Sequence, residues 1–224
     1  MVAIFVAVTF ILAIVIDTLV RKRQKSKVEE KTPIPAAQPA PGFPLGYFFT
    51  PGHVWLNLNP SGKLFMGLDE LIQRTIGKVS QITLKKSGEK IKKGELLATI
   101  SQGDKKLHLL SPIDGIIEKT NSELEETPQK FLDSPYKYGW FYSINPENLS
   151  EDLKNFTLAD KTRTWWLKEM SRLREFVQKW IPQQALAGLT LSDGGVPLND
   201  LVQYFDEKAL QEFEASFLHV KTSE

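Results

Sequence analysis

Turn residues recur at short intervals through the middle of the chain, and their spacing limits the fold more than any other feature. Between residues 47 and 149 the turn sequences are Asn59-Pro60-Ser61-Gly62, Ser87-Gly88, Lys93-Gly94, Gly103-Asp104 and Asp114-Gly115. Most segments between them are too short for helices but have the length of strands. The pattern therefore predicts a mainly β domain, built as a sandwich or flattened barrel.

One segment of this region has helical rather than strand periodicity. Its apolar residues recur at helical spacing, at Leu68, Leu71, Ile72 and Ile76. Asp69 is suited to cap the first turn, and Gly77 is suited to end the helix, because glycine adopts the left-handed conformation that follows many helices. We therefore expect one helix to cross the β structure.

A tight hairpin is predicted at residues 100–116, which read ISQGDKKLHLLSPIDGI. Gly103-Asp104 separates two alternating runs, and both residues tolerate the positive φ that two-residue hairpin turns need. The tip therefore carries Asp104, followed by Lys105 and Lys106. A shift of one residue along a strand moves a side chain to the other face of the hairpin, so the exact turn decides where each lysine points.

The chain begins with an apolar segment that predicts a single transmembrane helix. Val2–Val20 is apolar except for Thr9, Asp17 and Thr18, and its length just spans a hydrocarbon core of roughly 30 Å. A basic cluster, residues 21–27 (RKRQKSK), follows it directly. Because positive residues stay on the cytoplasmic side, we expect a single-pass protein of the cell (inner) membrane with its C-terminal domain in the cytoplasm.

A proline-rich linker is predicted between the membrane segment and the β domain. It contains Pro33, Pro35, Pro39, Pro41 and Pro44, which favour an extended polyproline conformation. Its proline-rich part, residues 28–46, has about 19 residues, which at roughly 3.1 Å each would reach up to ~60 Å from the bilayer.

Composition excludes several classes of function. The net charge is +1, so no strong field recruits nucleic acid, and the absence of cysteine excludes disulfides and thiolate chemistry. His53, His108 and His219 are far apart in sequence and have no metal-ligand spacing. No nucleophile-base pair or phosphate loop is present, so we predict neither a metal site nor an enzyme.

The last third of the chain, residues 151–224, is predicted to be helical and without strands. Residues 160–180 carry an apolar stripe opposite a largely basic face, and the stripe consists of Trp166, Met170, Leu173, Val177 and Trp180. The helix either packs on the β domain as a structural cap or joins a bundle of its own. Alternatively, it is offered to a protein partner or to a membrane surface.

Six short motifs follow one another in the middle of the chain. They are His53-Val54-Trp55; Gly67-Leu68 with Leu71 and Ile76-Gly77-Lys78-Val79; residues 88–95 (GEKIKKGE); Ser111-Pro112-Ile113-Asp114-Gly115; Asn121 with Leu124 and Pro128; and Ser134-Pro135-Tyr136 with Gly139-Trp140. In this order they resemble the H protein of the glycine cleavage system, a lipoyl carrier that shuttles an aminomethyl group. No motif is specific alone, but six in register make a specific match.

The resemblance implies a lipoyl-like fold whose hairpin presents one lysine for covalent attachment of lipoate. Counted back from Ser111-Pro112, that position holds Asp104, which has no amine. The family has an acidic, a small and an apolar residue before its lysine, whereas this chain has Ser101-Gln102-Gly103. Lys105 is the candidate attachment residue if the turn forms around Asp104-Lys105 instead of Gly103-Asp104.

We therefore expect four regions: a transmembrane helix with its basic stop (1–22), the linker (23–46), the H-protein-like domain (47–150) and the helical C-terminal region (151–224). The first functional hypothesis is a membrane-tethered scaffold or subunit without a cofactor, which binds protein partners and has the 160–180 helix as its candidate contact surface. The alternative is a lipoyl carrier modified at Lys105. The second alternative is a membrane-fusion-type secretion adaptor, which would need the opposite topology.

Overall fold

The computed structural model describes residues 44, 46–60, 62–182 and 199–219, all within one compact unit, Ala40–Glu224. The predicted membrane helix at residues 1–22 lies outside the described residues, as does almost all of the predicted linker at 23–46. Within the described ranges, no helix is long and apolar enough to cross a membrane. The described strand pairings and core residues lie within Ala40–Glu224, a compact unit with a hydrophobic core of its own.

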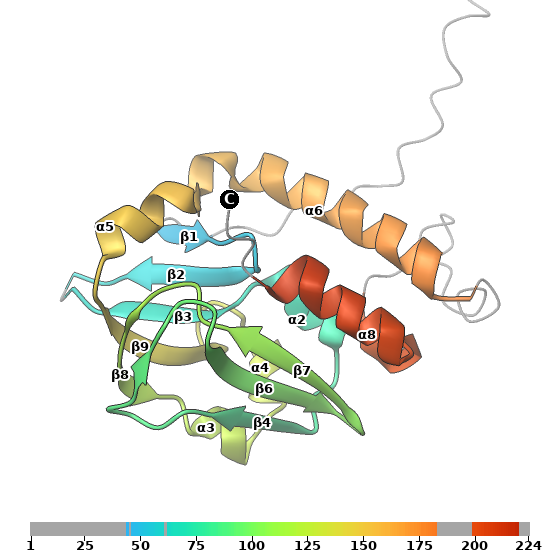
Figure 1. The fold of residues 1–224 in the computed structure, drawn as a ribbon, viewed down its shortest axis with the longest axis horizontal. Coiled ribbons are helices and arrows are strands. Elements are labelled where there is room, and N and C mark those ends of the chain that lie inside the picture. The colour runs from blue at the N-terminus through green and yellow to red at the C-terminus, as the bar shows by residue number, and fades with distance from the viewer. Residues whose placement is uncertain (1–43, 45, 61, 183–198, 220–224) are drawn as a thin grey trace, which may run out of the picture. The chain divides into compact units, whose positions relative to one another are not determined.

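The described strands form two antiparallel sheets (Figure 1). The larger sheet has the order β10-β1-β2-β3-β9-β8-β5. Its strands are β10 (Thr157–Leu158), β1 (Tyr47–Phe49), β2 (Val54–Leu58), β3 (Leu64–Leu68), β9 (Trp140–Pro146), β8 (Gly115–Thr120) and β5 (Lys90–Ile91). The smaller sheet has the order β4-β6-β7 and consists of β4 (Gln81–Leu84), β6 (Leu96–Gln102) and β7 (Lys105–Leu110). The predicted mainly β architecture is confirmed.

The predicted crossing helix is present as α2 (Glu70–Ile76). Asp69 caps it, because its carboxylate accepts the backbone N–H of Ile72 at 3.0 Å. Gly77 ends it at φ 75°, and its backbone N–H donates to the Gln73 carbonyl. A Cβ at Gly77 would lie 2.2 Å from the Asp200 carboxylate, so this position also needs glycine for space.

Several short elements were not predicted from the sequence. The single-turn helices α3 (Glu123–Glu126) and α4 (Lys130–Asp133) are too short to show a period. The expectation that residues 151–224 contain no strand is wrong, because β10 pairs with β1 with Phe48 opposite Leu158. A strand of two residues is too short to show the alternation of apolar and polar side chains by which strands are predicted. The elements α5 (Leu149–Asp152) and η1 (Leu153–Asn155) connect β9 to β10.

The C-terminal region packs on the β structure rather than apart from it. The long helix α6 (Ala159–Trp180) runs along the β1 side, and α8 (Glu207–Phe213) lies between α6 and β7 (Figure 1). The 3-10 turn η2 (Val202–Tyr204) precedes α8, and the π-helical turn η3 (Glu214–Leu218) follows it. Phe176 of α6 contacts Phe205, Phe213 and Phe217 at ring-centroid distances of 5.5 to 5.8 Å. This aromatic cluster joins the C-terminal elements to the main core.

On each edge of the smaller sheet, one backbone donor is satisfied by a carboxylate. The Leu84 backbone N–H on β4 donates to Glu125 at 3.0 Å, and the His108 backbone N–H on β7 donates to Glu214 at 2.5 Å. These side chains come from α3 and η3, the elements that pack beside each edge. An edge strand with one of its outward N–H groups already occupied has fewer free groups with which to pair another strand.

Candidate functional site

The predicted hairpin is formed by β6 and β7, with Gly103-Asp104 as its turn. Gln102 pairs with Lys105 and Ile100 pairs with Leu107 across the ladder. Gly103 has φ 62°, and Asp104 is not among the residues with positive φ, which is the pattern of a type II′ turn with glycine at its first central position. Because Lys105 already belongs to the ladder, the alternative turn around Asp104-Lys105 does not occur.

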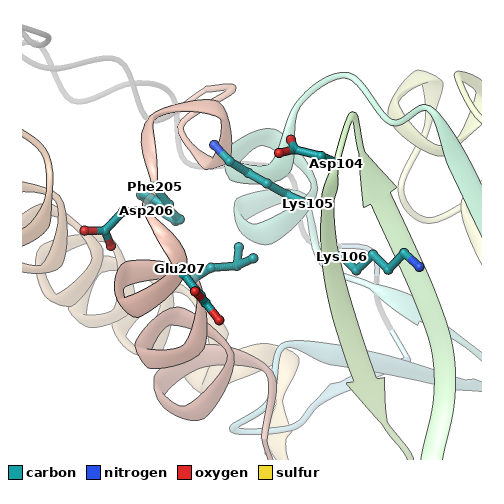
Figure 2. A pocket seen from close by; sticks show the side chains of 7 residues that line it. Asp104, Lys105, Lys106, Phe205, Asp206 and Glu207 are labelled. Carbon is teal, nitrogen blue, oxygen red and sulfur yellow. The ribbon is translucent and has the colours of Figure 1, made fainter.

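The two lysines after the turn lie on opposite faces of the hairpin (Figure 2). Lys105 shares its face with Leu107 and Leu109, which are buried in the core. Lys106 is exposed on the other face, and Asp104 is exposed at the tip. Asp104, which the count from Ser111-Pro112 predicts for the attachment position, is therefore displayed at the tip.

The Lys105 amine is held by the backbone of the C-terminal region. Its Nζ donates to the carbonyl oxygens of Val202 at 2.9 Å and Gln203 at 2.5 Å. An ammonium group has three donors, so one side chain satisfies both carbonyls. In this arrangement the amine is engaged at η2 rather than projected from the tip.

The carbonyls that hold Lys105 are themselves fixed in place. The backbone N–H groups of Asp200 and Leu201 donate to the carbonyls of Arg74 and Thr75 at the end of α2. The Gln102 side-chain amide donates to the Asp200 carboxylate at 2.7 Å and to the Ile76 carbonyl at 2.7 Å. The segment at 200–203 is thus bound to both α2 and the hairpin.

A groove of about 360 Å³ lies between the hairpin and α8 (Figure 2). Its lining combines basic, acidic and apolar side chains, namely Asp104, Lys105, Lys106, Phe205, Asp206, Glu207 and Leu210.

A lipoyl group joined to a lysine Nζ does not fit the residues around this groove as they stand. Asp104 has no amine. Acylation would convert the Lys105 ammonium into an uncharged amide with a single N–H. The carbonyls of Val202 and Gln203 each accept a hydrogen bond from this amine, so one of them would lose its donor.

A second titratable cluster lies in the core around His53. Its Nδ1 is 2.7 Å from Asp69, and its Nε2 is 3.4 Å from a Glu169 carboxylate oxygen, an ion-pair separation. The imidazole is fully buried, which opposes its charged form, but the charge and hydrogen bond of Asp69, with a contribution from Glu169, raise the pKa of His53 to about 9. The cluster is a buried ion-pair network, so the structural interpretation of His53 is supported over a catalytic one.

The sequence did not single out Glu169, because the helix at 160–180 was divided only into an apolar face and a charged face, and an acid belongs to the charged one. Its carboxylate is buried, which raises its pKa, yet His53 and Arg172 outweigh burial and lower the pKa below the usual range. Arg172 lies 2.8 Å from the Glu169 carboxylate and also donates to the Ser216 carbonyl. An acid on the apolar side of α6 was the signal that could have revealed this network.

Metal binding finds no support in the described part of the chain. No group of three or more His, Cys, Asp or Glu side chains there is arranged to hold a metal ion. His53 lies in the core, whereas His108 is half-exposed and pairs with Glu214 at 2.9 Å.

Comparison with known proteins gives consistent results for this region. The family model described as "Glycine cleavage H-protein" matches residues 47–169, more than half of the chain. A probable glycine cleavage system H protein of Pyrococcus abyssi is 29% identical over 116 residues, which cover 52% of this chain and 86% of that protein. A probable glycine cleavage system H protein 2 of Saccharolobus solfataricus is 31% identical over 110 residues, which cover 47% of this chain and 74% of that protein.

A solved structure, the glycine cleavage system H protein of Mycobacterium marinum, is also similar. It covers 53% of this chain and 94% of its own length, with a TM-score of 0.47 and 22% sequence identity.

Proposed function

The chain belongs to the glycine cleavage H-protein family, and from this membership we propose that it is a membrane-tethered member that carries no lipoyl group and acts by contact with protein partners. H proteins are carriers rather than enzymes, so the prediction that the chain is not an enzyme is confirmed. A scaffold or subunit of a membrane complex is the role that fits a carrier fold without its carried group.

The arrangement of the hairpin supports the absence of lipoate. Counting from Ser111-Pro112 puts Asp104 in the attachment position, and the nearest amine, that of Lys105, donates to Val202 and Gln203. An attaching enzyme needs a free amine as nucleophile at the tip of the turn. Asp104 offers none, and Lys105 would first have to leave both carbonyls.

The sequence supports the tether. The apolar run Val2–Val20 and the basic cluster at 21–27 have the order of a membrane anchor whose following domain stays in the cytoplasm. The proline-rich linker would then hold the H-protein-like domain near the inner face of that membrane.

The mass of the protein purified from its native host tests the absence of lipoate. We expect the intact mass to equal that of the unmodified chain and the tryptic peptides with Lys105 to be unmodified. The matched control is Asp104→Lys, which returns an amine to the turn and should gain a lipoyl group when produced with an active lipoyl-attaching enzyme. A lipoylated Lys105 in the native protein would contradict the proposal.

The second candidate function is a lipoyl carrier modified at Lys105. It is favoured by family membership, whereas the observed turn at Gly103-Asp104 counts against it because Lys105 lies in the ladder rather than at the tip. The segment at 200–203 would have to release the Lys105 amine before attachment. The same mass measurement separates the two candidates, and Lys105→Arg should abolish any modification if the carrier function is correct.

A further inference from the structure

The long helix α6 has an apolar face that is already occupied. Trp166, Met170, Leu173 and Val177 are at most 6% exposed and belong to the core of this unit. The hypothesis that this stripe, with Trp166 as an anchor, receives a protein partner is therefore wrong for the fold as it stands. What α6 offers to other molecules is its opposite face.

The opposite face of α6 is strongly basic. Of its exposed side chains that the structure describes, five are basic and one, Glu175, is acidic. The basic ones are Lys161, Arg163, Lys168, Arg174 and Lys179. Helical spacing puts Lys161, Lys168 and Lys179 along one flank of this face and Arg163 and Arg174 along the other, so positive charge borders the face on both sides in a protein whose net charge is only +1.

The buried acid of α6 is already paired with other residues. Glu169 is turned into the core, where its carboxylate pairs with His53 and Arg172. Within the described part of the chain, the side chains of Lys161, Arg163, Lys168 and Arg174 form no hydrogen bond or ion pair. Their charges remain available to an anionic surface.

The chain enters the folded unit beside this helix. Tyr47 begins β1, and the next residue, Phe48, pairs with Leu158, the residue before α6 begins. A linker that arrives from a membrane anchor therefore reaches the domain next to the start of α6. Anionic lipid attracts basic side chains that come within about 10 Å of its surface.

We propose that the exposed basic face of α6 lies on the anionic phospholipid surface of the membrane to which the chain is anchored. This inference rests on the proposed tether, which brings the face to the bilayer. The contact is electrostatic adsorption rather than insertion, because Leu167 is the one exposed large apolar residue among the described side chains of α6. It orients the domain so that the small sheet and the hairpin, on the other side of β1, face the cytoplasm (Figure 1).

The fragment 40–224 tests the face without the anchor, because it contains the whole described core. Co-sedimentation is measured with vesicles of phosphatidylcholine alone and of phosphatidylcholine mixed with phosphatidylglycerol. We expect binding only to the anionic vesicles and weaker binding as salt is raised, since salt screens the attraction.

Two triple variants locate the binding surface. The combination Arg163→Gln, Lys168→Gln and Arg174→Gln should weaken binding to anionic vesicles at least about tenfold, because each basic side chain near such a surface contributes several-fold. The control, Lys78→Gln, Lys86→Gln and Lys92→Gln, removes the same charge from exposed side chains outside α6 and should bind nearly as wild type. Thermal melts of both variants check that each remains folded.

Three outcomes would overturn the proposal: equal binding to both vesicle types, no binding to either, or an equal loss in both triple variants. If the fragment binds neither type of vesicle, an acidic protein surface would replace lipid as the expected partner of this face. The result does not depend on residues 1–39, so a failure of the tether and a failure of the lipid contact are observed separately.

Discussion

His53 joins three elements through one buried imidazole. It precedes β2, its Nδ1 contacts the Asp69 cap of α2, and its Nε2 faces Glu169 of α6. Its ring also packs against Trp165 and Phe217, with centroids 5.2 and 5.9 Å away. The backbone at His53 has φ 59°, an uncommon conformation for a residue other than glycine, and the surrounding contacts hold it. The position therefore links β2 and α2 to α6 and η3.

The free energy of unfolding should depend on pH through this histidine. Because folding raises the pKa of His53 from about 6.5 to about 9, its contribution is fully present below pH 6.5 and is lost as the pH rises through 9. Urea unfolding of the fragment 40–224 should show a loss of up to about 3 kcal/mol across this window. The variant His53→Gln should be less stable at pH 6.5 and should lose most of that pH dependence.

The half-exposed His108 provides the control for this measurement. His108→Gln should keep the difference between pH 6.5 and pH 9 that wild type shows, because His53 is unchanged. A His53→Gln variant with the full pH dependence of wild type would mean that another group carries it.

Among the elements, α6 shows most clearly what periodicity can predict. A helix was predicted at residues 160–180, and α6 spans Ala159–Trp180 with the predicted stripe facing the core. Periodicity gave the length and the buried face because both follow from 3.6 residues per turn. It could not give the partners of Glu169 or the neighbours of Phe176, because these come from segments distant in sequence.

Truncation of Trp166 tests the structural role of this helix. Trp166 is 6% exposed, so Trp166→Ala should lower the free energy of unfolding of the fragment 40–224 by roughly 3–5 kcal/mol. The adjacent Leu167 is 47% exposed, and Leu167→Ala should cost less than about 0.5 kcal/mol. Equal melting temperatures for wild type and Trp166→Ala would contradict the packing described for α6.

The hairpin marks the limit of sequence reasoning for the candidate site. Alternation and the Gly103-Asp104 turn were readable because they are local, and Asp104 could be placed by counting from Ser111. The contacts of Lys105 were not readable, because Val202 and Gln203 lie nearly a hundred residues further along the chain. Loops and turns that meet only in three dimensions leave no periodic signal.

For the whole molecule, the direction of the predicted anchor decides in which compartment the folded unit works. The basic cluster at 21–27 follows the apolar run, so the C-terminal end is expected in the cytoplasm. A reporter enzyme that is active only outside the inner membrane, fused after Glu224, should remain inactive, whereas a cytoplasmic reporter at the same point should be active. The reverse result would favour the secretion-adaptor alternative.

The carboxylates of Glu125 and Glu214 on the two edges of the small sheet have a consequence for a protein held at a surface. Molecules confined to a plane meet far more often than molecules in solution, and an open strand edge would let neighbours join into ribbons. At β4 and β7 an approaching strand would set its carbonyl oxygens against a carboxylate that already occupies the donor. Crowding in two dimensions would therefore meet an occupied donor at each of these two edges, which disfavours ribbons formed through the small sheet.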